Sequence, residues 1–449
     1  MWVSGVEAFF IEDTKGSKDI KNCTKFLGIV GILCIVGIFP RHAVPLPTCY
    51  TAFMSNELLT RAVSEVVPKA LAEDKLKTGK PLKIYLGIDP TGNKLHLGHS
   101  VPLRKLRAFQ QAGHEVTFLI GSFTAMIGDP SGRDKQREPL MSEQVLANFE
   151  TYKEQAALIL DFNKIEIVYN HMWLEKLTFV DVVNLASHFT MQQMMKRDMF
   201  AKRLENDDPI GVHEFLYPLM VGYDSVMLDV DCELGGSDQL FNMLAGRTLQ
   251  SVYGKRDKFV LTTRLIEGTD GRKMSKTYEN CIYLQDEPGD MYGKLLSLHD
   301  GLIITYFECC TEVPMAEVKE LEKQLKKGAN PKDIKMRLAR EIVTLYHGEE
   351  AAKQAESEFQ KVHKEKGIPE STPEVKVAKG SHIIDIIVEH KLAPSKSEAK
   401  RLIEQGGVHL NERGVSDINA KVEEGLTTEA LAKEVILKVG KRRFLKLKF

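Results

Sequence analysis

The sequence predicts an α/β protein in which a helix-covered parallel β-sheet is followed by a helical region and a small α+β unit. Short apolar runs alternate with helical stretches from Pro81 onward, as is typical of βαβ units. The chain becomes charged and helical after about Asp286, without a strand signal. The segment 366–377 contains prolines and has no apolar face, so we predict a linker there.

Each element of the α/β region has a local signal. We expect strands at LKIYLGI (82–88), VTFLIG (116–121), IEIVYN (165–170), SVMLDVDCELGG (225–236) and KFVLTT (258–263). We expect helices over 101–112, with Pro102 in the first turn, and over 143–159, and an amphipathic helix in MSNELLTRAVSEVVPKAL (54–71). The expected domains are therefore 54–285, 286–365 and 378–449, with a linker at 366–377.

The composition is that of a globular protein that can bury a large core, with 43% hydrophobic and 27% charged residues. A formal net charge of −1 argues against a uniformly polyanion-binding surface. From Lys376 onward, however, 15 Lys+Arg stand against 10 Asp+Glu, and this segment could meet nucleic acid. The seven cysteines have no zinc-ligand spacing, so we expect no metal centre and no disulfide framework, which fits a reducing cytoplasm.

Residues 1–53 stand apart because FLGIVGILCIVGIF (26–39) is an apolar run behind Lys25. It is short for a membrane span and similar to the apolar part of a signal peptide. Translation that begins downstream, at Met54, is the favoured interpretation. A targeting segment and a membrane anchor are the alternatives, and we expect this extension not to be part of the fold.

Two histidines frame a glycine in DPTGNKLHLGHS (89–100), between an expected strand and an expected helix. His96 and His99 then lie at a helix N-terminus, where free N–H groups favour an anion, and Gly98 lets a flat ring approach the backbone. A nucleotide triphosphate suits this arrangement. The tetrapeptide alone could also arise by chance, and nucleotidylyltransferases share it.

A second motif lies far downstream in GRKMSKTYEN (271–280), where Lys273 and Lys276 stand on a glycine-flanked loop. Lysines on such a loop can close on a pyrophosphate, although a lysine pair by itself is usually a solvated charge cluster. The HLGH and KMSKT segments together resemble the HIGH and KMSKS elements of class I aminoacyl-tRNA synthetases.

Four further segments resemble tyrosyl-tRNA synthetases of the bacterial type, and the resemblance extends from about Met54 to the C-terminus. These segments are YLGIDPTG (85–92), IGDPSGR (127–133), YPLMVGYDS (217–225) and GGSDQLFN (235–242). The resemblance implies a Rossmann-type catalytic domain, an α-helical anticodon-side domain and a C-terminal S4 RNA-binding domain. It also implies tyrosine, ATP with Mg²⁺ and tRNA(Tyr) as substrates and partners, a cytoplasmic enzyme, and a homodimer formed through the helices around 185–199.

The residue types fit this chemistry. Tyr85 and Asp224 can hydrogen-bond a phenol hydroxyl, while Asp129 and Tyr217 can hold an ammonium group. No protein nucleophile is needed for adenylate formation, so cations and hydrogen-bond donors should carry the catalysis. The resemblance implies His96, His99, Lys273, Lys276, Thr277 and Thr91 as catalytic, Gly98, Gly236, Asp238, Lys276, Arg133 and Arg137 as ATP-binding, and Gln239 beside the four residues above as tyrosine-binding.

Two positions depart from the family pattern. Val221 and Glu233 stand where many or some members carry glutamine, so one contact to the amino group is expected to be lost, and a water could replace it.

The C-terminal unit carries its basic residues in PSKSEAKRLIEQGGVHLNE (394–412) and in the final KVGKRRFLKLKF. The basic side chains of such a surface bind structured RNA by contacting its phosphates and by fitting its shape. The expected RNA-binding residues are Lys396, Lys400, Arg401, Lys441, Arg442 and Arg443. The alternatives to a tyrosine–tRNA ligase are a tryptophanyl-type synthetase and a non-catalytic RNA-binding protein that keeps the synthetase fold.

Overall fold

The computed structural model describes residues 57–131, 140–364, 372–378, 380–411, 413–422, 435–440 and 443–449. The N-terminal extension 1–53 and residues 366–371 of the expected linker lie outside these residues. The described residues form two compact units, one from 57–93 with those between 101 and 264, and the other from 94–100 with those between 265 and 449. Among the helices of the described ranges, none is long and apolar enough to span a membrane.

The first unit is built on a six-stranded sheet with the strand order β1-β6-β5-β2-β3-β4. The strands are β1 (Val63–Val67), β2 (Lys83–Ile88), β3 (Glu115–Ile120), β4 (Glu166–Tyr169), β5 (Cys232–Gly236) and β6 (Phe259–Thr263). All neighbouring pairs are parallel except β1 with β6. The central strands are buried on both faces, which explains why they read as continuous apolar runs in the sequence.

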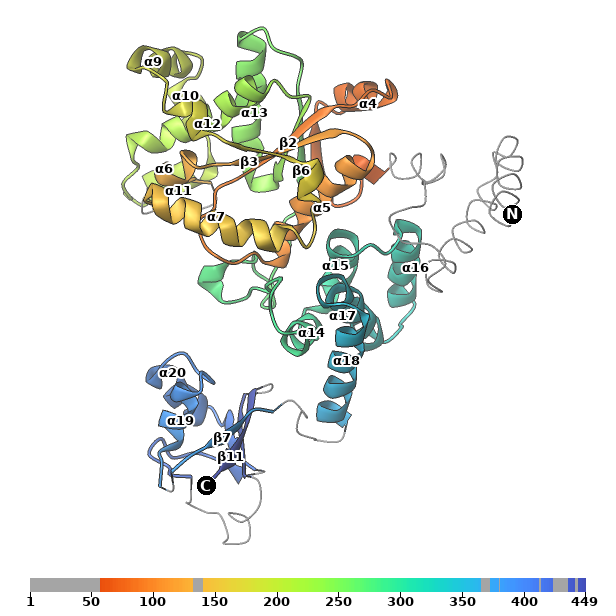
Figure 1. The fold of residues 1–449 in the computed structure, drawn as a ribbon, viewed down its shortest axis with the longest axis vertical. Helices are drawn as coiled ribbons and strands as arrows, with labels where there is room; N and C mark the ends of the chain where they lie inside the picture. Colours follow the sequence, from red (N-terminus) through yellow and green to blue (C-terminus); the bar gives the residue numbers. More distant parts are fainter. Residues whose placement is uncertain are drawn as a thin grey trace, which may run out of the picture. The chain divides into compact units, whose positions relative to one another are not determined.

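Helices cover both faces of this sheet. Figure 1 shows α5 (Leu97–Gln111) and α7 (Ser142–Ala156) on one side, and α12 (Val212–Leu228) and α13 (Leu240–Val252) on the other. The remaining helices of the unit are α4 (Lys69–Lys77), α6 (Thr124–Ile127), α8 (His171–Leu174), α9 (Phe179–Ser187), α10 (Met191–Met195) and α11 (Asp198–Glu205). This arrangement is the Rossmann-type α/β fold that the sequence predicts.

The strand order contains a topological switch point between β2 and β5. The chain leaves β2 toward β3 on one side and returns to β5 on the other. In open α/β sheets, ligands bind at the carboxyl ends of the strands at such a point. Asp89 follows β2 there, and Gly236 ends β5.

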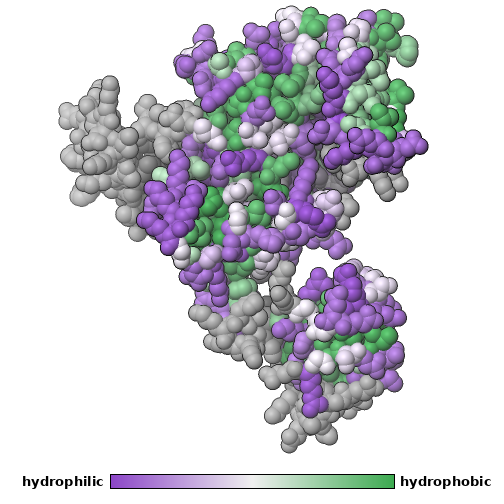
Figure 2. All heavy atoms as spheres, turned by 180° about the vertical axis from the view of Figure 1, so that it is seen from behind, coloured by the Kyte–Doolittle hydropathy of each residue, from purple (hydrophilic) through white to green (hydrophobic). Residues whose placement is uncertain are grey.

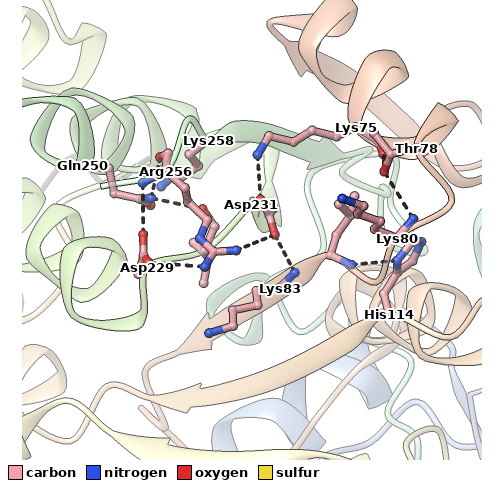
Figure 3. A network of polar contacts seen from close by, with 12 residues as sticks. Lys75, Thr78, Lys80, Lys83, His114, Asp229, Asp231, Gln250, Arg256 and Lys258 are labelled. Carbon is pink, nitrogen blue, oxygen red and sulfur yellow. Dashed lines mark hydrogen bonds and ion pairs between the residues drawn. The ribbon is translucent and has the colours of Figure 1, made fainter. Parts of the chain in front are cut away.

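The opposite, amino edge of the sheet is held by ion pairs (Figure 3). Asp231, just before β5, accepts hydrogen bonds from Lys75 Nζ at 2.6 Å, from the backbone N–H of Lys83 at 2.9 Å and from Arg256 at 3.1 Å. Its side chain is 8% exposed. Burial alone would raise the pKa of Asp231, but the bonds from Lys75 and Lys83 and the charge of Arg256 lower it. One carboxylate thus fastens α4, the start of β2 and the approach to β6.

Three local expectations were wrong. The stretch 54–71 was expected to be one helix, but 63–67 form the edge strand β1, because its β-branched valines pair with β6. Residues 225–228 were expected to be strand and instead extend α12, with Asp229 in a left-handed conformation ending the helix. Helix α5 begins at Leu97, so Pro102 lies inside it and offers no N–H to the carbonyl of Gly98.

The helical part of the second unit follows the expected charged region. It contains α14 (Pro288–Leu296), α15 (Ile303–Cys310), α16 (Met315–Lys326), α17 (Pro331–His347) and α18 (Glu349–Lys364). Helix α17 shows how local sequence sets the ends: Asn330 caps the backbone N–H of Lys332, Pro331 occupies the first turn, and Gly348 follows with a φ of 87°.

The C-terminal part is a five-stranded sheet in the order β7-β11-β10-β8-β9, packed with two helices. Its elements are β7 (Glu374–Lys376), α19 (Ile383–Glu389), α20 (Lys396–Glu404), β8 (Val408–Leu410), β9 (Arg413–Gly414), β10 (Val435–Val439) and β11 (Arg443–Lys448). It has its own core, in which Ile387, Ala399 and Leu437 are buried together. Because β7 pairs with β11, the end of the expected linker at 366–377 belongs to this sheet.

Candidate active site

The HLGH segment is joined to the chain just after the KMSKT segment. The backbone N–H of Leu97 donates to the carbonyl of Ile282 at 2.9 Å, and that of Leu284 donates to the carbonyl of Leu95 at 3.0 Å. His96 and Tyr283 form the antiparallel bridge between these two bonds. Both motifs therefore lie in the second unit, close in space although far apart in the sequence.

Both imidazoles are oriented by backbone donors. The N–H of Gly98 donates to Nδ1 of His96 at 3.1 Å, and the N–H of His96 donates to Nδ1 of His99 at 3.2 Å. The two rings stack with their centroids 3.8 Å apart. An Nδ1 that accepts a hydrogen bond carries no proton, so each neutral ring has its proton on Nε2. Each neutral histidine therefore has a single N–H donor, at Nε2.

The electrostatic surroundings keep these rings neutral. Burial, the charge of His99 and the charges of Lys276 and Lys273 lower the pKa of His96 to about 2. Burial and the same two lysines lower the pKa of His99 to about 4. A Cβ at Gly98 would lie 2.9 Å from the His96 ring, so this position has no room for a side chain.

The KMSKT segment follows a short hairpin. Glu267 bridges Lys273 across the hairpin, and Gly271 occupies its turn with a φ of 79°. Asn280, which is 2% exposed, accepts from the backbone N–H of Ser275 at 2.8 Å and donates to Asp270 at 2.6 Å and to the carbonyl of Lys273 at 3.1 Å. Lys273 and Lys276 are exposed beyond this anchored base. The arrangement gives a fixed loop base with two cations at its rim.

A second set of expected site residues lies in the first unit. Tyr217 and Asp224 stand two turns apart on α12, and both are buried. Asp224 accepts from Trp173 Nε1 at 2.8 Å and from Asn170 Nδ2 at 3.2 Å. Burial raises the pKa of Asp224 well above its ordinary value, against the effect of those two bonds.

The hydroxyl groups of the two tyrosines have different partners. Tyr85, in the middle of β2, has its hydroxyl 3.0 Å from Ser225 Oγ. Tyr217 donates to Asp89 Oδ2 at 2.9 Å. Burial and nearby carboxylates raise the pKa of both hydroxyls, so both stay protonated at neutral pH. Asp89 was quoted in the DPTG segment but was not expected to have this role.

Several acidic side chains act on Tyr217 through their charge. Asp89, Asp129 and Asp224 each raise its pKa through their charge. Asp129 accepts from Gln239 Nε2 at 2.7 Å, and this places the expected residues Asp129 and Gln239 together. The carboxylates of Asp89 and Asp129 near this buried tyrosine favour a ligand cation over an anion.

The positive charge of Arg197 partly offsets the negative charge of these carboxylates. Its guanidinium donates to Ser131 at 2.8 Å and lies over the Phe241 ring at 4.7 Å, and burial lowers its pKa to about 10. The amide of Asn242 bonds Ser131 at 3.3 Å and Gln239 at 2.9 Å.

Several of these partners have no signal in the sequence. Asn170, Trp173, Arg197 and Asn242 come from different elements and form no local pattern, although Asn242 ends the quoted GGSDQLFN segment.

Other expected residues are placed as follows. Thr91 follows β2, where its N–H donates to the carbonyl of Asp89 at 2.8 Å. Gly236 ends β5, and Asp238 lies in the 3-10 turn Ser237–Gln239 that follows it. Val221 is half-buried on α12 between Tyr217 and Asp224. Arg133 and Arg137, with Lys441 and Arg442 and the side chain of Thr277, lie outside the described residues.

The expected RNA-binding residues of the C-terminal part are on its surface. Lys396 and Lys400 lie exposed on α20 with Arg401, and Arg443 is exposed at the start of β11. Lys396 pairs with Asp385 at 2.7 Å and Arg401 pairs with Glu398 at 2.8 Å. Exposed pairs of this kind are weak and can exchange for phosphate.

Comparison with known families decides between the interpretations. Residues 77–364 match the model of class I tRNA synthetases (W and Y). The chain is a class I tRNA synthetase of this family. Residues 363–447 of this synthetase match the model of the tyrosine–tRNA ligase SYY-like C-terminal domain, which favours the tyrosine branch.

The synthetase has similar relatives along most of its length. A tyrosine–tRNA ligase of Thermotoga maritima is 47% identical over 87% of this chain and 96% of its own, and one of Haemophilus influenzae is 44% identical over 87% and 96%. Among solved structures, a truncated mitochondrial tyrosyl-tRNA synthetase of Coccidioides posadasii matches with a TM-score of 0.54 and 27% identity over 69% of this chain and 91% of its own. The predicted tyrosyl-tRNA synthetase resemblance is confirmed.

The neutral histidine pair generates a prediction. The His96→Gln and His99→Gln variants identify the two ring signals in the NMR spectrum of the wild-type protein, because each variant loses one of them. In the wild type these signals should not titrate between pH 8 and 5.5, because burial and the loop lysines hold both pKa values below that range. A histidine peptide in the same buffer serves as reference and titrates at about 6.5. A midpoint between pH 6 and 7 for either ring would contradict the arrangement.

Proposed function

We propose that this synthetase is a tyrosine–tRNA ligase that activates tyrosine with ATP and transfers it to tRNA(Tyr). The observation that carries the proposal is the backbone pairing that holds HLGH beside KMSKT in a chain of the tyrosine and tryptophan family. Tyrosine-dependent exchange of pyrophosphate into ATP tests it. Absence of exchange with any amino acid would favour a non-catalytic RNA-binding protein, and exchange with tryptophan alone would favour the sister enzyme.

The first half-reaction needs no nucleophile from the protein. The tyrosine carboxylate attacks the α-phosphorus of ATP, a P–O bond forms to the carboxylate, and the P–O bond to pyrophosphate breaks. Negative charge spreads over the phosphates in the transition state, so donors and cations aimed at them lower the barrier. The Nε2–H groups of His96 and His99 are such donors, and they need no proton transfer to act.

The remaining phosphate contacts are assigned by the motif positions. Lys273 and Lys276 would bind the pyrophosphate from the loop rim, and Gly98 would let the nucleotide approach the backbone. The proposed ATP-binding set also includes Gly236 and Asp238, and Arg133 and Arg137 beyond the described residues, while Thr91 and Thr277 are proposed to act in catalysis. Mg²⁺ would enter on the phosphates of ATP, as it commonly does.

The first unit is proposed to select the amino acid. The carboxylates around Tyr217 support Asp129, Tyr217 and Gln239 as the partners of the tyrosine ammonium group. Asp224 and Tyr85 are assigned to the phenol hydroxyl. Trp173 and Asn170 hold the carboxyl group of Asp224 in a fixed orientation, and such preorganisation reduces the cost of binding.

Binding of tRNA is assigned to the C-terminal part, through Lys396, Lys400, Arg401 and Arg443 with Lys441 and Arg442. The helices α14 to α18 would face the anticodon side. A cytoplasmic location follows the same proposal, since the tRNA substrate is used there.

A homodimer is also proposed, through the helices that precede α12. Leu185, Met194 and Met199, within the range expected to form the interface, are buried inside the chain. The exposed apolar side chains of this region are Phe179 (84%), Val180 (66%), Val183 (51%) and Met191 (59%). Figure 2 shows apolar surface gathered at the upper right, where α9 lies. Apolar patches of this kind usually mark an interface.

The dimer prediction concerns this surface. Sedimentation equilibrium at micromolar concentration should give twice the chain mass of 50.6 kDa. Phe179→Asp should shift the protein to monomer, because a charge there would be buried unpaired, whereas Val252→Asp on α13 should not. A wild-type monomer would contradict the proposal.

The lysine prediction separates binding from chemistry. Lys276→Ala should slow adenylate formation by about tenfold or more and leave tyrosine affinity nearly unchanged, because its charge acts where phosphate charge develops. Pre-steady-state formation of tyrosyl-adenylate and equilibrium dialysis of tyrosine measure the two quantities. Lys319→Ala, an exposed lysine on α16, is the charge-matched control. An equal loss of tyrosine affinity would remove the assigned role.

The truncation prediction concerns tRNA. Removal of residues 365–449 should preserve pyrophosphate exchange and greatly reduce tRNA charging, since the C-terminal part has its own core. The full-length triple variant Lys396→Ala/Lys400→Ala/Arg401→Ala should show the same pattern more weakly, with a shallower salt dependence of tRNA binding. Undiminished charging by the truncated protein at physiological salt would mean that tRNA is held elsewhere.

The specificity prediction concerns phenylalanine, which lacks one oxygen. A site built to bind a hydroxyl leaves buried polar groups unpaired without it, and tyrosyl-tRNA synthetases are themselves the standard example of this principle. Asp224→Ala should abolish most tyrosine activation. Tyr85→Phe should cost about 1 kcal/mol or less and narrow the preference over phenylalanine. Exchange kinetics with both amino acids measure the preference, and unchanged ratios in both variants would place the phenol elsewhere.

A further inference from the structure

A lysine and a glutamate are buried together behind Tyr85. Lys258, just before β6, has a side chain that is 0% exposed, and that of Glu233 on β5 is 5% exposed. The Lys258 ammonium contacts Glu233 Oε2 directly and donates to Ser225 Oγ at 2.6 Å. Glu233 is the position that departs from the family's glutamine, and the structure shows it engaged in this pair.

The sheet register explains why the pair reaches Tyr85. Tyr85 on β2 and Glu233 on β5 are direct neighbours in the parallel pairing, so their side chains lie on the same face of the sheet. Ser225 reaches this face from α12 and lies 3.0 Å from the Tyr85 hydroxyl and 3.2 Å from Glu233 Oε2. The Lys258 ammonium lies 5.8 Å from the centroid of the Tyr85 ring.

Space for the ammonium is made on a neighbouring helix. A Cβ at Gly246 of α13 would lie 2.5 Å from Lys258 Nζ and 2.4 Å from Ser225 Oγ. Any larger residue at 246 would displace one of these groups. The packing between α12 and α13 is therefore shaped around the lysine as well as around apolar side chains.

Stability alone is a weak reason for such a pair. Removing two charges from water is costly, and well-packed apolar residues often replace a buried ion pair without loss of stability. The pair has a different effect on Ser225, because an ammonium can only donate and a carboxylate can only accept. Ser225 Oγ accepts from Lys258 and gives its own proton to Glu233.

The direction of these bonds fixes the Tyr85 hydroxyl. With its proton committed to Glu233, Ser225 Oγ can only accept from Tyr85. The Glu233 carboxylate, whose charge and hydrogen bond raise the pKa of Tyr85, can also only accept, so the Tyr85 proton points into this group of side chains. The lone pairs of the Tyr85 oxygen are then left to accept from a ligand hydroxyl. Tyrosine carries that hydroxyl and phenylalanine does not.

We propose that Lys258, Glu233 and Ser225 form a buried relay that orients the Tyr85 hydroxyl, and that this relay is a specificity determinant for tyrosine over phenylalanine. This inference rests on the proposed function, in which Tyr85 reads the substrate phenol. The three residues are positioning residues: they act through Tyr85.

The test is the ratio of kcat/KM for tyrosine to that for phenylalanine in pyrophosphate exchange. Ser225→Ala should lower this ratio by about five- to tenfold, the equivalent of one neutral hydrogen bond. Thr262→Val is the matched control, because Thr262 is 1% exposed on β6 and its hydroxyl donates to the carbonyl of Glu65 at 3.4 Å, away from Tyr85 and Ser225. It removes one buried hydroxyl and should leave the ratio unchanged.

A double-mutant cycle distinguishes orientation from general structure. In a Tyr85→Phe background, Ser225→Ala should cause no further change in the ratio, because the hydroxyl it orients is gone. An equal fall in both backgrounds would overturn the inference, as would a ratio within twofold of wild type for Ser225→Ala alone.

The charge pair is tested by Lys258→Met/Glu233→Leu, which removes both charges together. Its ratio should fall as that of Ser225→Ala does, and an unchanged ratio in a folded protein would overturn the relay. If this double variant does not fold, Ser225→Ala decides. A wild-type protein without tyrosine-dependent exchange would refute the proposed function itself, whereas wild-type exchange with an unchanged Ser225→Ala ratio would refute the relay alone.

Discussion

The candidate phosphate site depends on one piece of backbone pairing, the antiparallel contact of Leu95–Leu97 with Ile282–Leu284. Neither motif could act alone. The histidines have no charge to offer, and the loop lysines without the pairing would have no fixed partner. The contact is made by backbone groups, so it does not use the side chains of His96 and Tyr283 at its centre. The N–H groups of His96 and Gly98 at the start of the helix that begins at Leu97 set the two tautomers, and burial together with the loop lysines lowers both pKa values.

Neutral histidines beside lysines form a consistent electrostatic design. A charged imidazole next to Lys273 and Lys276 would repel them and would weaken their hold on a phosphate. Burial removes that conflict by disfavouring the charged ring, and the backbone N–H groups that bond Nδ1 leave Nε2–H as the donor. In the proposed mechanism, charge neutralisation is thus left to the lysines, and directional hydrogen bonding to the histidines.

Much of the fold could be predicted from the sequence, because the parallel strands are short apolar runs separated by helical periodicity. The failures are equally physical. In VSEVV the helical spacing of the surrounding stretch competes with β-branched residues, and pairing with β6 decides for a strand. In SVML a continuous apolar run does not distinguish a buried helix from a buried strand. Tertiary packing decides whether such a run forms a helix or a strand, and a single sequence does not show that packing.

The candidate site divides in the same way. Residues inside ordered motifs could be named in advance, since glycine, histidine and lysine stand there in a recognisable order. Their partners could not, because Trp173, Asn170 and Arg197 reach the site from helices or turns with no pattern of their own. Glu233 shows the limit most clearly. Its sequence position suggested a lost contact to an amino group, while Lys258, which explains it, lies outside every motif.

A second buried ion pair helps to interpret the Lys258–Glu233 pair. Arg203 and Glu214, on α11 and α12, are as deeply buried, and Arg203 NH1 lies 2.7 Å from Glu214 Oε2. Their further bonds go to backbone groups, the carbonyl of Pro209 and the N–H of Gly211, so this pair closes the loop between the two helices. The further hydrogen bonds of the Lys258–Glu233 pair go to the hydroxyl of Ser225, which in turn bonds Tyr85. Two pairs with the same burial therefore differ in what they hold: one fixes a chain path, and the other fixes the direction of a hydroxyl proton. Only the second has a geometry that can change which amino acid is bound.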